Sequence, residues 1–130
     1  MEVQLRSLLA DDTAIAALVG TRIYWNTIPQ TATDPCVVMY VISRLADAHH
    51  GGANRLNNWI VQIDVRAVTY ASAIAVRDAI VTKLHAKRFS QGGLKIVTVL
   101  QSERQRSEKP GTTLYHTVQL DFSVGSGNAG

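Results

Sequence analysis

His49 and His50 are adjacent and follow Asp47 by two residues in the stretch RLADAHHGGANRLN, residues 44–57. Imidazole and carboxylate groups bind metals and transfer protons, so these three residues could form part of a metal or acid–base site. A zinc site needs three or four convergent ligands, whereas adjacent histidines beside two glycines point in different directions. A catalytic pair also needs a rigid site, which a Gly-rich loop does not provide. The stretch therefore favours a projecting loop. A metal hydrolase that uses Asp47, His49 and His50 is the least favoured of the three functional hypotheses considered below.

The remaining reactive side chains favour structural roles. His85 is close to the end of a predicted helix, where a cation suits the helix dipole, and His116 is on the apolar face of a predicted strand. Cys36 is the single cysteine, so we expect no disulfide within the chain, a reduced cytosolic compartment and burial of this thiol in a strand. No Walker loop, G-x-S-x-G elbow, G-x-G-x-x-G turn or Cys/His nucleophile pair occurs. We therefore predict no catalytic residues, no metal, no cofactor and no enzymatic activity.

Composition predicts one folded domain. The chain has 130 residues, of which 46% are hydrophobic and 18% charged, as in ordinary globular domains. We expect a single domain over residues 1–124 and a flexible tail, GSGNAG, over residues 125–130. We expect neither secretion by a leader peptide nor insertion in a membrane, because no basic leader or long apolar run occurs.

Basic residues are concentrated in the second half of the chain. The net charge is +3, and residues 67–130 contain eight basic and four acidic side chains. This charge is low for a dedicated DNA-binding protein. Two alternatives remain open for the cluster of Arg104, Arg106 and Lys109. Either the cluster contacts an acidic neighbour or DNA, or it is exposed to water in a turn.

Two short helices and an extended segment are predicted before the first long strand. Apolar spacing in residues 2–19 indicates two helices joined at Asp11 and Asp12, with Asp12 or Thr13 as a helix N-cap and Gly20 as a stop. Residues 21–35 contain two prolines and are expected to form an extended edge segment followed by a loop.

Two strands are predicted to form a hairpin around the opening stretch. Residues 36–44 are apolar on both alternating faces, which is typical of a strand covered on both sides. Residues 58–68 alternate between apolar and polar side chains. The apolar row of this second strand consists of Trp59, Val61, Ile63, Val65 and Ala67.

A long helix and a second hairpin follow. Thr69 is the predicted N-cap of a helix over residues 70–87, with Ala73, Val76, Ile80 and Leu84 at helical spacing. After a short basic loop, strands are predicted at 94–104 and 113–124, joined by a polar turn at 105–112. The apolar row of the last strand consists of Leu114, Val118, Leu120, Phe122 and Val124.

These elements predict an α+β fold. We expect a mostly antiparallel four-stranded sheet with one long helix and short N-terminal helices packed on one face. The opposite face is polar and free for water or for a neighbouring molecule. It contains Gln62, Asp64, Arg66, Gln119 and Asp121.

The chain resembles the phage tail-terminator or tail-completion (head-tail joining) family. The stretch LRSLLADDTAIAALVGTRIYWNTIPQTATDPCVVMYVIS resembles the opening of these proteins, with matching motifs at residues 9–24 and 35–40. VQIDVRAVTYASAIAVRDAIVTKL resembles the strand and long helix of the family, and LYHTVQLDFSV resembles its closing strand. Each motif is a packing pattern, but their order and spacing together cover about residues 1–124.

The resemblance implies a structural role in the virion, after assembly in the host cytoplasm. Family members cap a finished tail tube as a six-fold ring, stop tail elongation and join the tail to the head-completion complex. The implied partners are further copies of the chain, the major tail-tube protein and a head-completion or connector protein. DNA is expected to pass through the lumen of the ring without sequence-specific binding.

The tips of the two predicted hairpins are the expected contact arms, because projecting strands and loops can pair with neighbouring chains. The alternative hypothesis is a small cytosolic ligand-binding or regulatory α+β module. The expected interface residues at the tips are His49, His50, Asn54, Arg55, Arg104, Arg106 and Lys109.

Overall fold

The computed structural model describes residues 1–29, 33–45, 57–91 and 93–128. The elements are three helices and six strands. In chain order they are α1 (Glu2–Ala10), α2 (Thr13–Val19), β1 (Ile23–Trp25), β2 (Cys36–Leu45), β3 (Asn57–Ala67), α3 (Tyr70–Leu84), β4 (Lys87–Gln91), β5 (Leu94–Glu108) and β6 (Tyr115–Asn128).

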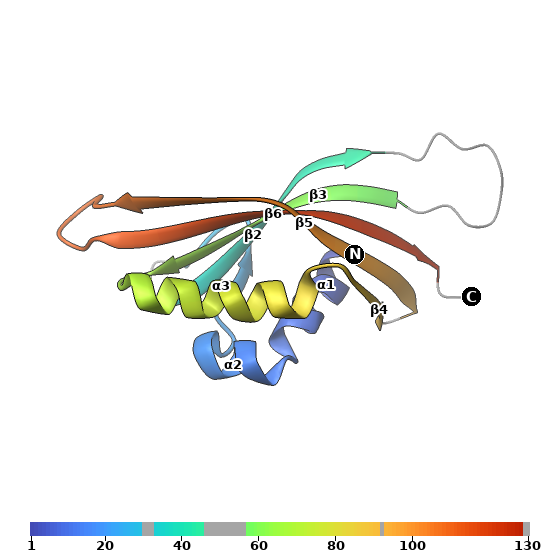
Figure 1. Ribbon diagram of the computed structural model, residues 1–130, viewed down its shortest axis with the longest axis horizontal. Coiled ribbons are helices and arrows are strands. Elements are labelled where there is room, and N and C mark those ends of the chain that lie inside the picture. The colour runs from blue at the N-terminus through green and yellow to red at the C-terminus, as the bar shows by residue number, and fades with distance from the viewer. Residues whose placement is uncertain (30–32, 46–56, 92, 129–130) are drawn as a thin grey trace.

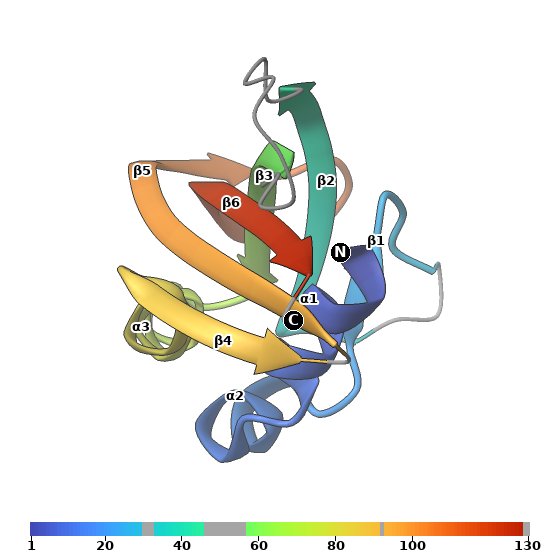
Figure 2. The ribbon, with the colours of Figure 1, turned by 90° about the vertical axis from the view of Figure 1, so that its right-hand side faces the viewer.

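The six strands form one curled sheet in the order β1-β2-β3-β6-β5-β4 (Figures 1 and 2). Neighbouring strands are antiparallel except β1 and β2, which are parallel. All three helices lie on the same side of the sheet, which we call the inner face (Figure 1). The predicted α+β class and the one-sided packing of the helices are confirmed. No helix in the described part of the chain is long and apolar enough to cross a membrane.

The helices begin where the sequence predicts, but the end predicted for the third helix at residue 87 is wrong, because α3 ends at Leu84 and β4 begins at Lys87. The side chain of Asp12 accepts a hydrogen bond from the backbone N–H of Ile15 at the start of α2, and Thr69 accepts one from Ser72 at the start of α3. Both bonds satisfy a backbone donor that the helix itself leaves unpaired. Gly20 ends α2 with a φ of 58°, a conformation that glycine adopts without strain.

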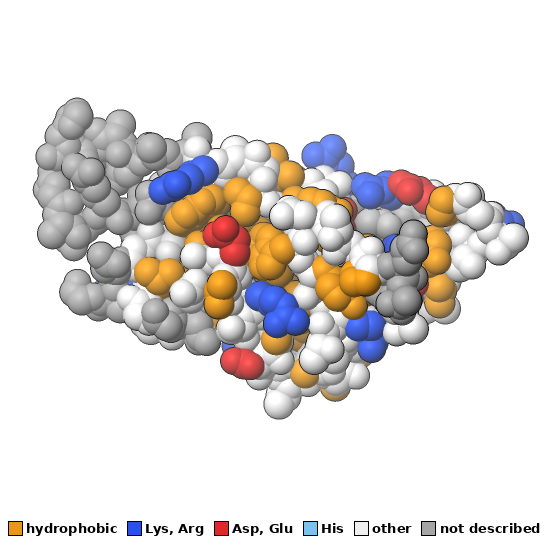
Figure 3. Space-filling view, turned by 180° about the vertical axis from the view of Figure 1, so that it is seen from behind, with side chains coloured by type: hydrophobic (Ala, Val, Ile, Leu, Met, Phe, Trp, Pro, Cys, Tyr) orange, Lys and Arg blue, Asp and Glu red, His pale blue; other side chains and the backbone are white. Residues whose placement is uncertain are grey.

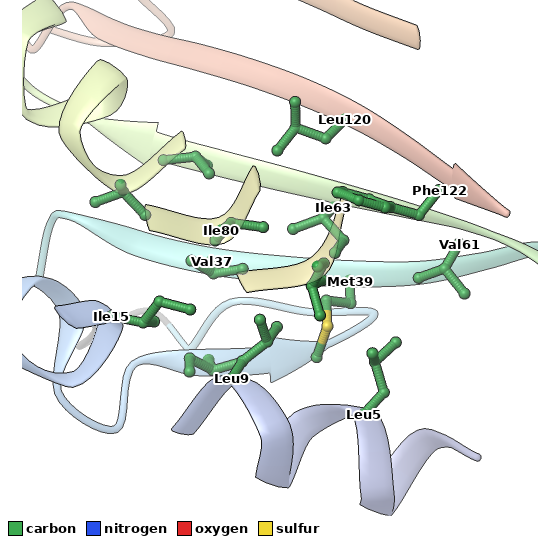
Figure 4. Packing of buried hydrophobic residues seen from close by; sticks show 14 of the residues in the cluster. Leu5, Leu9, Ile15, Val37, Met39, Val61, Ile63, Ile80, Leu120 and Phe122 are labelled. Atoms are coloured by element: carbon green, nitrogen blue, oxygen red, sulfur yellow. The ribbon is translucent and has the colours of Figure 1, made fainter. Parts of the chain in front are cut away.

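Buried hydrophobic side chains from the helices and the sheet form one core between the two layers (Figure 4). Leu5 and Leu9 of α1 lie toward Met39 of β2 and Ile15 of α2 lies toward Val37, while Phe122 of β6 comes from the other side of the cluster. Full burial of each large apolar side chain contributes roughly 1.5–3 kcal/mol to folding. In the predicted apolar row of β3, all members are buried except Trp59, which is partly buried.

The predicted number of four strands is wrong, because two short edge strands extend the sheet. Part of the expected edge segment forms β1, which pairs with Val37–Met39 of β2. The predicted basic loop after α3 forms β4, which pairs with Leu94–Thr98 of β5. Ala86, with a φ of 54°, reverses the chain between α3 and β4. In β4 only Phe89 packs against the core, so this strand has no apolar alternation that could reveal it.

The second hairpin is longer than predicted. The turn predicted at 105–112 is wrong for its first four residues, because β5 continues to Glu108, which pairs with Tyr115. Leu114 therefore lies in the connection, 45% exposed, and not in the apolar row of β6. The flexible tail predicted from residue 125 is also wrong for residues 125–128, which pair with Leu94–Val97 of β5. Strand pairing uses backbone groups, so a stretch rich in glycine and serine can still extend a strand.

Only half of β2 is covered on both faces. Residues 36–39 are buried, as predicted, but Val41 and Ile42 are 38% and 55% exposed. The change coincides with a β-bulge between Val41 and Ser43. The predicted hairpin of β2 and β3 is confirmed, because the two strands are antiparallel from Cys36↔Arg66 to Leu45↔Asn58.

Candidate protein interface

The structure places the predicted interface residues in two groups. His49, His50, Asn54 and Arg55, together with Asp47, lie outside the described residues. Within the described part of the chain, no cluster of three or more His, Cys, Asp or Glu side chains could hold a metal ion. The remaining predicted residues lie on or beside β3, β5 and β6.

Arg104 and Arg106 are not at a hairpin tip. They are strand residues of β5, opposite Gln119 and Thr117 of β6, and only Lys109 lies in the connection. Strand register therefore brings the predicted basic cluster and the predicted polar face onto one surface. We call this surface the outer face; it consists of Gln62, Asp64, Arg66, Arg104, Arg106, Gln119 and Asp121.

Arg106 joins three strands of the outer face. Its Nε lies 2.7 Å from Oε1 of Glu108, and its side chain donates to Oε1 of Gln119 at 3.2 Å. A third contact places the guanidinium 3.8 Å from Oδ2 of Asp64, on β3. Because the guanidinium has several donors in a fixed plane, one arginine can hold these acceptors together.

Asp64 is buried, although the sequence predicts that the outer face is open to water. Only 6% of Asp64 is exposed, because neighbouring side chains on the face cover it. Gln62 donates to its Oδ1 at 3.0 Å. Burial raises the pKa of the Asp64 carboxyl above its ordinary value, while the bond from Gln62 and the charge of Arg106 oppose this rise.

A second pair on the outer face is close to solvent. Oδ2 of Asp121 accepts a hydrogen bond from the hydroxyl of Ser102 at 3.0 Å and lies 3.7 Å from the guanidinium of Arg104. The Arg104 side chain is 74% exposed, so this pair contributes little to stability. Carboxylates nevertheless lie beside both arginines of the predicted basic cluster.

The end of the outer face near α3 is tied to the preceding loop. Arg66 donates from Nε to Oδ1 of Asp34 at 2.8 Å, and its guanidinium lies 4.5 Å from the centre of the Tyr115 ring. Cys36 is fully buried, and its thiol donates to Oδ1 of Asp34 at 3.5 Å. Burial raises the pKa of the Cys36 thiol to about 11. The prediction of a buried strand cysteine is confirmed.

The inner side of the β5–β6 hairpin is bound to α3 by residues that the sequence did not single out. Tyr70 donates to Oε1 of Gln105 at 3.0 Å, and Arg77 donates to Oε2 of Glu103 at 3.0 Å. The Tyr70 ring also meets His116 edge-on, with ring centres 6.0 Å apart. In the sequence, the one signal for this contact is a tyrosine, Tyr70, at the first position of the predicted helix.

The two remaining histidines have structural partners. Nδ1 of His116 lies 3.0 Å from the Ser107 hydroxyl, across the β5–β6 ladder. At the C-cap of α3, Nδ1 of His85 accepts a hydrogen bond from the backbone N–H of Leu100 at 3.2 Å. His85 therefore supplies an acceptor for a backbone N–H of β5.

Charges of opposite sign also alternate elsewhere on the described surface. Viewed from behind, Lys and Arg side chains are scattered singly among hydrophobic and polar residues, with a few acidic side chains between them (Figure 3). The described residues in this view form no continuous basic patch of the kind that a dedicated DNA-binding face presents.

Comparison with known proteins assigns this architecture to a family. The family described as tail completion protein gp17 matches residues 3–125. Among solved structures, a chain of the virion of a native gene transfer agent (GTA) particle is 18% identical, with a TM-score of 0.70 over 97% of this chain and 93% of that chain. A second solved structure is 20% identical, with a TM-score of 0.60 over 96% of this chain and 89% of the other. The search of curated proteins found no match.

The family match covers nearly the whole chain and confirms the resemblance stated from the sequence. At these low identities the two solved structures show that the fold is shared. The chain therefore belongs to the tail completion protein gp17 family and is a non-enzymatic structural component of a virion tail.

Proposed function

We propose that this chain forms a homo-oligomeric ring, a hexamer, which closes the end of a completed tail tube and stops its elongation. The opposite side of the ring binds the head-completion or connector complex, and DNA passes through the lumen. Family membership supports this function and argues against a small ligand-binding or regulatory module.

The projecting β5–β6 hairpin is the observation that carries the proposal. It reaches beyond the N-terminal end of α3 (Figure 1), and every residue from Gln101 to Leu114 is exposed. A long exposed hairpin is poorly stabilised by its own chain and is a suitable contact arm. Its inner side is nevertheless held to α3 through Tyr70 and Arg77, which fixes the direction of the arm before a neighbour binds.

The charge arrangement on the outer face supports passage of DNA without specific binding. Arg104 and Arg106 lie beside Asp121, Asp64 and Glu108, so their positive charges are largely balanced within the chain. Of the two contacts considered for the basic cluster, an acidic neighbour and DNA, contact with DNA requires free cations and is the less favoured. Contact with an acidic neighbour remains open to Lys109 in the connection.

Capping of tail tubes is the direct test. Tubes assembled from the major tail-tube protein are incubated with this chain and imaged by electron microscopy, and native mass spectrometry counts the copies bound. We expect six copies at one tube end and no further growth when tube subunits are added. Tubes that stay uncapped and continue to grow at saturating protein would overturn the proposal.

A matched pair of variants ties capping to the arm. Replacing residues 109–112 by Gly-Ser makes the connection between β5 and β6 shorter and uncharged. Lys87→Ser removes a basic residue from β4, which pairs with the opposite end of β5. We expect the first change to weaken capping and the second to leave it unchanged. The reverse order of effects would place the contact at β4.

A further inference from the structure

The sheet has two edges that are open over part of their length. β4 pairs with β5 only as far as Thr98, and β1 pairs with β2 only as far as Met39. Among the described residues, no strand pairs with the outer edge of β5 beyond Thr98 or with that of β2 beyond Met39. A β-bulge stands at the start of each open stretch, between Leu100 and Ser102 and between Val41 and Ser43.

Backbone hydrogen bonds reveal which groups the open edge of β5 presents. The N–H of Leu100 points away from β6, because it donates to His85. N–H groups alternate in direction along an antiparallel strand, and the bulge after Leu100 shifts this alternation by one residue. The N–H groups of Glu103, Gln105 and Ser107 therefore point outward from the sheet.

The same reasoning applies to β2. The carbonyl of Met39 points outward, because it accepts a hydrogen bond from the N–H of Asn26 at 2.9 Å. Val41 has the same direction, and after the bulge the outward residue is Arg44. Within the described part of the chain, both open stretches thus offer unpaired donors and acceptors at strand spacing.

We infer that the open stretch of β5, residues 101–108, pairs with the open stretch of β2, residues 40–44, of the next copy of the chain in the ring. This inference rests on the proposed ring. Consecutive strands from β2 through β3 and β6 to β5 are antiparallel, so β5 runs opposite to β2. A neighbour in the same orientation therefore presents β2 to β5 as an antiparallel pair.

A second copy is a better occupant of these edges than another protein, because one contact satisfies both. The two edges lie on opposite sides of the curled sheet (Figure 2), so the contact uses two different patches and repeats from copy to copy. Such a heterologous contact closes into a ring when the rotation per copy is correct. Each open stretch is the C-terminal part of its strand, and because β2 and β5 run in opposite directions, the two stretches lie at opposite ends of the sheet. The resulting stagger is the geometry by which sheets close.

Exposed hydrophobic side chains accompany each open stretch. Val41 and Ile42 are exposed on β2, and at the other end of the molecule Val68, Tyr70 and Leu114 are 49%, 52% and 45% exposed. Tyr70 touches the arm through Gln105. Pairing of the two edges brings apolar surface toward apolar surface, which adds a hydrophobic contribution to the backbone hydrogen bonds.

Gln105→Pro tests the inference. Proline removes an N–H that points to the open edge, while the bonds between β5 and β6 use the neighbouring residues. Gln105→Ala is the matched control, because it loses the same side chain and keeps the N–H. We expect Gln105→Pro to raise the protein concentration at half assembly by at least about tenfold, and Gln105→Ala to change it by less than about threefold.

Amide hydrogen exchange separates the inference from the proposed function. In the assembled wild-type ring, the amides of Glu103, Gln105 and Ser107 should exchange at least about tenfold more slowly than in the monomer. If a ring forms while these amides exchange as in the monomer, the edge pairing is wrong and the proposed ring stands. The same holds if Gln105→Pro assembles into rings as well as Gln105→Ala does. Rings that assemble normally with Gln105→Pro but fail to cap tubes would assign the edge to the tube protein instead. The absence of any ring, alone or on tubes, overturns the proposed function itself.

Discussion

Arg66 and Asp34 are 32 residues apart in the chain, and Nε of the arginine donates to Oδ1 of the aspartate at 2.8 Å. A second donor of the same guanidinium lies 3.4 Å from Oδ2, so the contact uses both carboxylate oxygens. The Asp34 side chain is only 10% exposed. The pair therefore holds Asp34, just before β2, against Arg66 of the outer face, and Asp34 also accepts a hydrogen bond from the buried Cys36 thiol.

Breaking this pair should destabilise the protein. Arg66→Ala and Asp34→Ala are each expected to lower the free energy of unfolding by about 2 kcal/mol, because each leaves a poorly solvated charge without its partner. The double variant should lose less than the sum of the two, and chemical denaturation of all four proteins measures the coupling. Arg66→Lys keeps the charge but not the paired donors, so it should recover only part of the loss. Additive losses would show that the two side chains do not interact.

The Cys36 thiol should be unreactive at neutral pH. Burial raises its pKa from 9.0 to about 11, so the thiolate is scarce in the folded protein and more available in the unfolded chain. The folded state then holds a proton that the unfolded state releases between pH 9 and 11, and stability from this group falls as pH rises through that range. The rate of reaction with an aromatic disulfide reagent, with and without denaturant, measures the first effect. Cys36→Ser, which should remove the pH dependence, is the control for the second.

The sequence predicts the parts of the fold that depend on apolar periodicity. Val61, Ile63 and Val65 alternate with polar residues, and helix caps such as Thr69 are local signals, so the sequence predicts β3 and the start of α3 closely. The outer half of β5, SERQRSE, contains no apolar residue, and every residue in it is exposed. Its pairing depends on backbone bonds and on cross-strand contacts, which no local pattern reveals.

The predicted polar face illustrates what a single strand cannot show. Alternation places Asp64 and Arg66 on one side of β3, opposite to the buried row of Val61, Ile63 and Val65. That Arg106 approaches Asp64 depends on the register of β5 with β6 and of β6 with β3, which is a property of the whole sheet. Burial of Asp64 follows from this convergence, so it could not be predicted from the β3 sequence.

Removing the charge of Asp64 should stabilise the protein at neutral pH. Burial raises the pKa of this carboxyl, so the contribution of Asp64 is largest when it is protonated and falls as pH rises through the folded-state pKa. Asp64→Asn should therefore be more stable than the wild type at pH 7, and the difference should shrink on acidification. Thermal unfolding at a series of pH values measures this difference. Asp121→Asn removes a negative charge from the same face and serves as the control; an equal gain for both would show that net charge, and not burial, is responsible.

Tyr70 should control the order of the β5–β6 arm without controlling the fold. Its hydroxyl donates to Gln105, and its ring meets His116. Tyr70→Ala should speed hydrogen exchange at the amides of Arg104 and Arg106, which point toward β6, by about threefold to tenfold. Tyr70→Phe, which keeps the ring, should have a smaller effect. A large drop in melting temperature for Tyr70→Ala would mean that the arm and the core unfold together.

The balance of charge on the outer face should keep DNA binding weak, and removing the carboxylates should create it. Asp64, Glu108 and Asp121 lie beside Arg104 and Arg106, so the triple variant Asp64→Asn, Glu108→Gln, Asp121→Asn frees both arginines and raises the net charge from +3 to +6. Fluorescence anisotropy with labelled duplex DNA should show little binding by the wild type near 150 mM salt. For the variant, log K should fall with log salt concentration by roughly 0.9 per phosphate contacted.

A control with the same net charge separates a local effect from a general one. Glu2→Gln, Asp11→Asn and Asp78→Asn also give +6, but the changes lie on α1, on its C-cap and on α3. If this control binds DNA as well as the outer-face variant, net charge alone explains the binding and the pairing of Arg104 and Arg106 is irrelevant to it. If the wild type already binds with the same steep salt dependence, the carboxylates do not balance the arginines, and the outer face is a DNA-binding surface in its own right.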